Sequence, residues 1–176
     1  IIKHKSGYFL DCEKINIDNL IKQLNLYKLR SKVEILNLSN EFVIAVISKE
    51  RFSDMEDSSS YAGCTIKFRE DSIFLDPRNI ELGARIVTNL EKLYLSLKKL
   101  GLQSADKNEY YKLSHEIGIP QKNTDKLQNK LFGIECNFDE LKAIDFKKGC
   151  YVGQENTARI KLKDKLNKRL FPIEVI

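Results

Sequence analysis

The order of its short apolar segments constrains the fold of this chain more than any other feature. Residues 7–12 read as a strand, and residues 20–29 carry apolar side chains at the spacing of an amphipathic helix. Residues 32–38 alternate between apolar and polar side chains, and residues 42–47 are almost wholly apolar. A strand, a helix and two paired strands predict a β-α-β-β unit, the start of a ferredoxin-like split fold.

The middle of the chain predicts further strands and helices. We expect strands at 64–68 and 73–75, and a helix over 107–117 that ends at Gly118. The pattern of residues 84–100 is ambiguous, because it fits a helix throughout and a strand equally well in its first part.

Two segments are expected to lack regular structure: the polar and acidic stretch 53–60, read as a mobile loop, and residues 124–138. The predicted class is α+β, with one lobe at 1–102 and a second at 103–176. The last residues, 170–176, read as the opening of a strand with no later partner, so we expect further sequence beyond them.

Positive charge is concentrated near the end of the chain. Lys and Arg number 30 against 25 Asp and Glu, and the excess lies in residues 142–169. Such a patch attracts an anionic small molecule, RNA or an acidic protein. Lys outnumbers Arg here, whereas nucleic-acid readers rely more on Arg, so direct nucleic-acid binding is the less favoured expectation.

The cysteines and histidines predict no metal site held by this chain alone. The histidines stand alone, and the four cysteines are too far apart for zinc or for most iron–sulfur clusters: Cys12, Cys64, Cys136 and Cys150. The first residues lack a secretory signal, and no apolar run is long enough to span a membrane. We therefore expect reduced thiols, no membrane partner and a cytoplasmic location.

Residues 147–155, KKGCYVGQE, are the most unusual stretch. Two glycines bracket a cysteine and an aromatic residue, directly before a predicted helix at 156–162. If Cys150 lies at the N-terminus of that helix, backbone N–H groups favour its thiolate, as do Lys147 and Lys148. The alternative is that Cys150 is a small buried hydrophobic residue.

This stretch resembles the K-G-C-Y-x-G-Q-E signature of the YgfZ family, folate-binding relatives of the glycine-cleavage aminomethyltransferase. The resemblance covers residues 7–172. Other segments match the family in the same order: Tyr27-Lys28-Leu29-Arg30, Asp76-Pro77-Arg78, Leu82-Gly83-Ala84-Arg85, Gly118-Ile119-Pro120, Glu135-Cys136-Asn137-Phe138-Asp139 and Thr157-Ala158-Arg159.

The resemblance implies ferredoxin-like lobes of the aminomethyltransferase folate-binding fold, followed by a C-terminal barrel that this chain lacks. It implies tetrahydrofolate, or a one-carbon derivative, as cofactor. It also implies a role in iron–sulfur cluster assembly or repair, with indirect effects on tRNA modification. The implied partners are folate and iron–sulfur assembly proteins or their client enzymes.

The same resemblance makes Cys150 the candidate nucleophile or transient cluster ligand. The candidate folate-binding residues are Lys148, Tyr151, Gln154, Glu155, Glu116, Glu135 and Arg159. Each has a plainer interpretation: core packing for the tyrosine, helix capping for Gln154 and Glu155, and solvated surface charge for the others. Arg78 and Arg85 are expected to form stabilising ion pairs.

Two departures from the family pattern weaken the expectation of tight folate binding. Ser114 stands where the family usually has Arg, and Gly133 stands where it has Pro. Loss of the Arg removes a bidentate grip on a carboxylate. An aminomethyl or one-carbon transferase and a tRNA-binding module remain as alternative functions.

Overall fold

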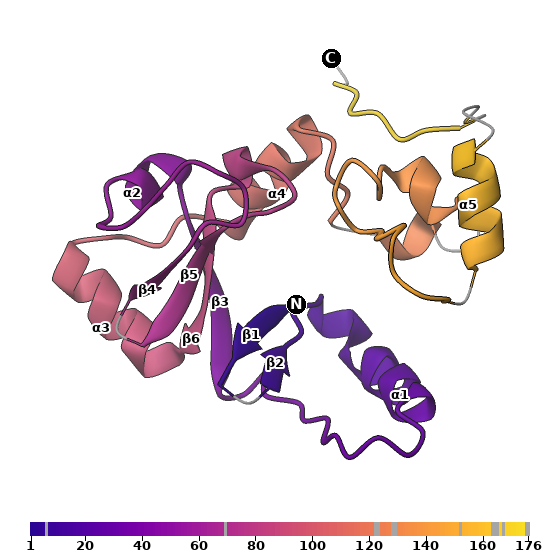
Figure 1. The fold of residues 1–176 in the computed structure, drawn as a ribbon. Coiled ribbons are helices and arrows are strands. Elements are labelled where there is room, and N and C mark those ends of the chain that lie inside the picture. The colour runs from indigo at the N-terminus through magenta and orange to yellow at the C-terminus, as the bar shows by residue number, and fades with distance from the viewer. Residues whose placement is uncertain are drawn as a thin grey trace. The chain divides into compact units, whose positions relative to one another are not determined.

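The computed structural model describes residues 1–5, 7–68, 70–121, 124–127, 130–151, 153–162, 166 and 168–174. Contacts group the chain into two compact units, Ile1–Val43 and Ile44–Ile176. Both contain helices and antiparallel strands, so the described structure is α+β (Figure 1). The lobes expected at 1–102 and 103–176 are a different partition, which stays a prediction.

The first unit consists of a short hairpin and one long helix. β1 (Ile2–His4) pairs antiparallel with β2 (Gly7–Phe9), and η1 (Lys14–Asn16) leads into α1 (Ile17–Tyr27). The predicted helix is confirmed, although it begins and ends earlier than expected. None of the described residues of this unit is buried.

The strand predicted at 32–38 is wrong, and with it the β-α-β-β unit. These residues form no strand, and the side chains of Val33 and Leu36 are 53% and 61% exposed. Alternation supplies one apolar face, but a strand also needs a hydrogen-bonding neighbour. β3 (Phe42–Ile47), confirmed at its predicted bounds, lies instead beside a strand from much later in the chain.

That neighbour belongs to a four-stranded sheet in the order β3-β6-β5-β4. β4 (Thr65–Phe68) and β5 (Asp71–Leu75) pair antiparallel, as do β5 and β6 (Ala84–Asn89). Both strands expected at 64–68 and 73–75 are thus confirmed within one or two residues.

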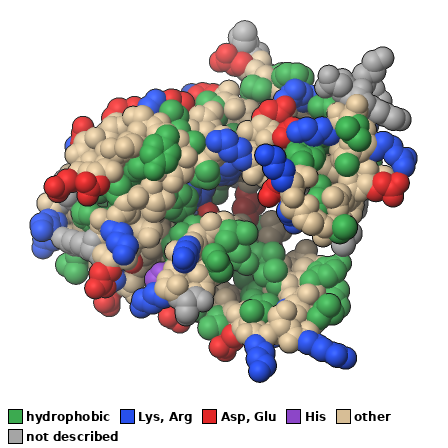
Figure 2. Space-filling model, in the orientation of Figure 1, with side chains coloured by type: hydrophobic (Ala, Val, Ile, Leu, Met, Phe, Trp, Pro, Cys, Tyr) green, Lys and Arg blue, Asp and Glu red, His purple; other side chains and the backbone are tan. Residues whose placement is uncertain are grey.

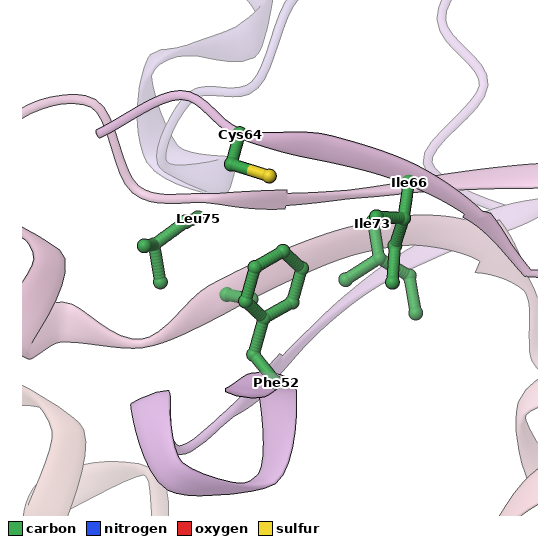
Figure 3. Close-up of a cluster of buried hydrophobic side chains, with 6 residues drawn as sticks. Phe52, Cys64, Ile66, Ile73 and Leu75 are labelled. Atoms are coloured by element: carbon green, nitrogen blue, oxygen red, sulfur yellow. The ribbon is translucent and has the colours of Figure 1, made fainter. Parts of the chain in front are cut away.

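One face of the sheet carries the main hydrophobic core. Phe52, from the short helix α2 (Lys49–Ser53), is fully buried and points between the strands, as Figure 3 shows. Ile66 and Ile73 are paired on adjacent strands and approach the same ring, together with Cys64 and Leu75 (Figure 3). The core therefore joins α2 to residues far along the chain.

Gly83 allows the end of β3 to pass close to the turn before β6. This residue follows η2 (Ile80–Leu82) with φ 77° and ψ −160°, a conformation almost confined to glycine. A Cβ here would lie 2.1 Å from the carbonyl oxygen of Ile47. The glycine of the Leu-Gly-x-Arg segment is therefore required by the sheet.

The ambiguous segment 84–100 contains both predicted structures in succession. β6 ends at Asn89, whose side chain accepts a hydrogen bond from the backbone N–H of Glu91 and so begins α3 (Leu90–Leu100). The helix predicted at 107–117 is confirmed as α4 (Lys107–Glu116).

The segment expected to be loop-like at 124–138 is more structured than predicted. It forms two short 3-10 helices, η3 (Thr124–Leu127) and η4 (Gly133–Cys136), and the second buries three consecutive side chains. Such helices are too short to show a periodic pattern. η4 contacts α5 (Gln154–Leu162), the helix predicted at 156–162 (Figure 1).

The remaining predictions concern loops and the last residues. Ser53 ends α2, residues 54–60 form turns, and Met55 packs against the core, so this stretch is partly anchored. Residues 170–174 form no strand; residues 175 and 176 lie outside the described part. No described helix is both long and apolar enough to cross a membrane.

Candidate functional site

Asp76 forms a buried ionic cluster with the two arginines expected to make ion pairs. Arg78 donates to both carboxylate oxygens, from Nε at 2.9 Å and from a terminal nitrogen at 2.7 Å. Arg85 approaches Asp76 at 3.6 Å, and both arginines donate to the hydroxyl of Tyr110 on α4. The expected ion pairs are confirmed, and they join the Asp-Pro-Arg turn to the Leu-Gly-x-Arg segment and α4.

The charge balance of this cluster explains why the carboxyl group of Asp76 is deprotonated. Burial alone would raise the pKa of its carboxyl group, but the hydrogen bonds and charge of Arg78, with the charge of Arg85, hold that pKa below its usual value. The pKa of Arg78 is raised, because the partnership with Asp76 outweighs the opposing effect of burial. Asp76 is therefore a structural anion.

The Glu-Cys-Asn-Phe-Asp segment organises the second part of this unit. The carboxylate of Glu135 accepts a hydrogen bond from the backbone N–H of Phe132 at 2.8 Å and caps η4. Asn137, at φ +63°, donates from its side chain to the carbonyl of Leu170 and accepts from Nε of Arg169. The segment thus holds residues 168–172 against η4.

The two departures from the family pattern occupy tightly packed positions. Ser114 is fully buried and donates to the carbonyl of Tyr111, so an arginine in this orientation would have no room for its charge. A Cβ on Gly133 would lie 2.7 Å from the ring of Phe138. Both residues fit the packing of this chain.

Cys150 lies on the surface, four residues before α5 begins. It is exposed, which rules out the alternative that it is a small buried hydrophobic residue. It also lies outside the first turn of α5, so the expected support of its thiolate by the helix N-terminus is not provided directly. What the structure offers is an accessible thiol on a turn.

The residues beside this thiol form a local hydrogen-bonded loop. The backbone N–H of Tyr151 donates to the side-chain oxygen of Gln154, and the N–H of Gln154 donates back to the carbonyl of Tyr151. The ammonium of Lys148 lies 4.9 Å from the centre of the Tyr151 ring. The Tyr151 hydroxyl is buried without a hydrogen-bond partner among the described residues.

The other predicted folate-binding residues are spread over three elements. Glu155 and Arg159 pair with each other on α5 at 2.7 Å, and Glu116 is an exposed residue of α4 that pairs with Lys112 at 3.8 Å. Glu135 is buried in η4. Gln154 has the capping role of its plainer interpretation, and the folate-binding roles of the whole set stay predictions.

The positive patch at 142–169 is partly neutralised by acidic neighbours. Arg159 pairs with Glu155, and Lys161 on α5 pairs with Asp139 at 2.8 Å. Figure 2 shows Lys and Arg side chains intermingled with Asp and Glu over the part of the surface that carries α5. Residues 163–165 and 167 of the patch lie outside the described part of the chain.

The other three cysteines differ from Cys150 in their surroundings. Cys64 and Cys136 are buried, and burial together with the charge of Glu135 raises the pKa of the Cys136 thiol. Burial and the charge of Asp11 likewise raise the pKa of Cys12. Within the described part of the chain, no group of three His, Cys, Asp or Glu side chains could hold a metal ion.

A surface depression of about 300 Å³ is lined by none of the predicted site residues. Its polar lining comes from Arg78, Asn79, Asn137, Glu140 and Arg169, and its apolar lining from Ile117, Leu141 and residues 170–172. No sequence motif marks Arg169, Glu140 or Tyr110. Their roles follow only from partners that lie far away in the sequence.

The chain is similar to curated iron–sulfur cluster assembly factors named IBA57. It is 29% identical over 168 residues to the mitochondrial homologue of Dictyostelium discoideum and 29% identical over 173 residues to the mouse protein. It is 30% identical over 166 residues to the homologue of Mycosarcoma maydis. No protein-family model matches the chain.

These alignments cover nearly all of this chain but less than half of each relative. They span 95%, 96% and 94% of the chain, and 41%, 45% and 38% of the respective relatives. The similarity supports the expected connection with iron–sulfur cluster assembly. Membership of the YgfZ family itself stays a prediction.

The relatives correct one expectation. All three are named as mitochondrial proteins, which contradicts the cytoplasmic location expected from the sequence. Widely spaced cysteines fit any reducing compartment of the cell, and they do not distinguish the cytoplasm from a compartment inside the mitochondrion.

Proposed function

We propose that this chain is part of an accessory protein for mitochondrial iron–sulfur cluster assembly that binds tetrahydrofolate and acts through Cys150. The observation that carries the proposal is the exposed Cys150 within a K-G-C-Y-x-G-Q-E loop, in a chain similar along nearly its whole length to IBA57 assembly factors. The effect on tRNA modification is indirect, through cluster-containing enzymes.

The arrangement of the loop supports a role for Cys150 toward an anionic cargo. The thiol is accessible, and the ammonium of Lys148 is held nearby by the ring of Tyr151. A cluster with thiolate ligands carries negative charge, which favours approach to such a loop. Cys150 would bind the cluster in transit, as a ligand that is released when the client accepts it.

Tetrahydrofolate would be held through its polar ring and its anionic tail. Tyr151 offers a ring face for stacking, and the carboxylates of Glu155 and Glu116 suit the amino groups of a pterin. Lys148 and Arg159 would attract the anionic glutamate tail as it approaches the protein. On this proposal the ferredoxin-like aminomethyltransferase fold supplies the scaffold, and the folate is a bound cofactor.

The proposal is tested with the complete protein in cells that lack their own assembly factor. We expect wild-type protein to restore the activity of mitochondrial iron–sulfur enzymes, and Cys150→Ser to restore less than about a fifth of it, since serine keeps the size but loses the soft sulfur ligand. Cys12→Ser, at a partly exposed thiol, is the matched control and should restore full activity.

Two further measurements separate the parts of the proposal. The wild-type protein and Cys150→Ser are titrated with tetrahydrofolate in the absence of oxygen. Both should bind it, because the Cys150 thiol is not a proposed folate ligand. Full rescue by Cys150→Ser would overturn the role of the cysteine. Failure of the wild-type protein to bind tetrahydrofolate would overturn the folate part alone.

A further inference from the structure

The depression of about 300 Å³ combines charged and apolar side chains on one surface. Its volume reaches the lower end of the range for small-molecule sites. Three segments that the sequence analysis singled out meet at its rim, represented by Arg78, Gly118 and Asn137. Residues from distant parts of the chain thus converge on one concave surface.

The charged lining of the depression is predominantly positive. The side chains of Arg78 and Arg169 are 29% and 37% exposed, and Glu140 is the acidic side chain in the lining. Asp76 lies behind Arg78, is only 1% exposed and is shared with Arg85. A bound molecule would therefore meet two guanidinium groups and one carboxylate.

Arg169 retains hydrogen-bonding capacity toward the depression. Its Nε donates to Asn137, and one terminal nitrogen donates to Glu140. Among the described residues, the other terminal nitrogen has no hydrogen-bond partner. A guanidinium fixed by two neighbours in this way is already oriented to receive a carboxylate.

The remaining lining is apolar. Leu141 and Ile117 contribute aliphatic surface, and Phe171 and Pro172 contribute a ring and a rigid edge. Phe171 is 73% exposed, so its ring is accessible to a ligand. Apolar walls with a few converging charged donors suit an organic anion better than a small inorganic ion.

We propose that this depression binds the carboxylate end of a small organic anion, with Arg169 as the donor, with the positive charge of Arg78 beside it, and with Phe171 and Leu141 against its apolar body. The identification of this anion with the benzoylglutamate half of tetrahydrofolate rests on the proposed function. The site itself rests on its lining residues.

The test uses the opposite charges of Arg169 and Glu140 in the complete protein. Binding of tetrahydrofolate and of 4-aminobenzoylglutamate is measured by calorimetry for the wild type, Arg169→Gln and Glu140→Gln. Arg169→Gln should weaken binding about tenfold, because a charged donor is lost. Glu140→Gln should tighten it severalfold, because Glu140 competes with the ligand for Arg169.

A merely structural role of this pair predicts a different result. If Arg169 and Glu140 only hold residues 168–172 in place, both variants lose the same ion pair and both should weaken binding. The matched control is the pair of Lys49 and Glu81, whose side chains are 32% and 50% exposed against 37% and 49% here. Lys49→Gln and Glu81→Gln should leave both affinities unchanged.

The outcomes distinguish this site from the proposed function. Equal weakening by the two variants, or no change in either, would overturn the site. Binding of 4-aminobenzoylglutamate with opposite responses would support the site even if tetrahydrofolate did not bind, in which case the folate part of the proposed function falls. If neither ligand binds, the site falls together with the folate part of the proposed function, and the proposed role of Cys150 is unaffected.

Discussion

At the scale of the residue, Asp76 shows how a short motif becomes a structural centre. Its carboxylate is buried and accepts two hydrogen bonds from the Arg78 side chain, while Arg85 and Tyr110 complete the cluster. The sequence pattern indicated ion pairs for both arginines. It could not indicate Tyr110 or Gln121, whose amide oxygen accepts from Tyr110 and Arg78 in the orientation that satisfies every partner.

The first residue-scale prediction concerns Asp76→Asn. This change leaves two partly buried guanidinium groups without their anion and should lower the free energy of unfolding by about 3 kcal/mol at pH 7. Urea denaturation measures the difference. Asp139→Asn breaks a more exposed ion pair with Lys161 and should cost less than about 1 kcal/mol.

The pH dependence of stability follows from the same carboxylate. Because the pKa of Asp76 is lower in the folded chain than in the unfolded one, the unfolded chain binds more protons as the pH falls. The contribution of the Asp76 carboxylate to the free energy of unfolding is complete above about pH 5, and it is lost as the pH falls toward the pKa of Asp76 in the folded chain. The Asp76→Asn variant should therefore show a shallower loss of stability than the wild type below about pH 5 in the same urea titrations; identical slopes would contradict this account.

Cys150 illustrates a residue that the sequence pattern could single out but whose structural setting it could not predict. The glycines and lysines around it marked the loop, and its exposure is consistent with a functional thiol. The distance to α5 depends on where the helix begins, and capping by Gln154 and Tyr151 sets that start three residues past Tyr151. The condition under which the helix N-terminus would favour the Cys150 thiolate is therefore not met, because Cys150 lies four residues before α5 begins.

At the scale of the element, α5 is attached to its unit by polar contacts. It has no buried residue, and Lys161 contacts both Asp139 and the ring of Phe146, which lies 3.8 Å from its ammonium. A helix held in this way opens more readily than one with a buried apolar face.

We predict that Lys161→Ala loosens α5 without unfolding the sheet. Loss of the ion pair and the ring contact should cost about 1 kcal/mol, so amide hydrogen exchange across Gln154–Leu162 should become roughly fivefold faster. The control is Lys112→Ala, which removes an exposed ion pair within α4. This variant should leave amide exchange across α5 unchanged. Unchanged exchange in α5 would show that other contacts hold it.

Elements with a strong local signal were predicted and those that depend on distant partners were not. The helix over 107–117 and the strand at 42–47 have clear patterns and clear ends. The strand at 32–38 was wrong because an alternating pattern does not by itself supply a hydrogen-bonding neighbour, and the strand that β3 pairs with, β6, comes from much later in the chain. η4 was missed because a single 3-10 turn shows no periodic pattern, and its neighbours, α5 and Leu170, come later in the chain.

At the scale of the whole molecule, the two compact units differ in what stabilises them. The unit Ile44–Ile176 contains the core around Phe52, whereas the described residues of Ile1–Val43 include none that is buried. A peptide of that size rarely buries enough apolar surface to offset the entropy lost on folding.

We therefore predict that residues 1–43, made as a separate peptide, show no cooperative thermal transition by circular dichroism. Residues 44–176 alone should retain one, because they keep β4, β5, β6 and most of β3, together with α2 and the Asp76 cluster. A cooperative transition in the short peptide would contradict this view of the first unit.

The sequence alone determined the class of secondary structure in most segments, the residues that form ion pairs around Asp76, and the loop that presents Cys150. These three features depend on the short-range spacing and the chemistry of neighbouring residues, and both can be recognised in the local sequence. Tertiary structure decided that β3 pairs with β6, that Gly83 must remain free of a side chain, and that Arg169 meets Arg78 at one depression. These features depend on which distant segments come together. A residue is buried or hydrogen-bonded by partners from elsewhere in the chain, and no local sequence pattern identifies those partners.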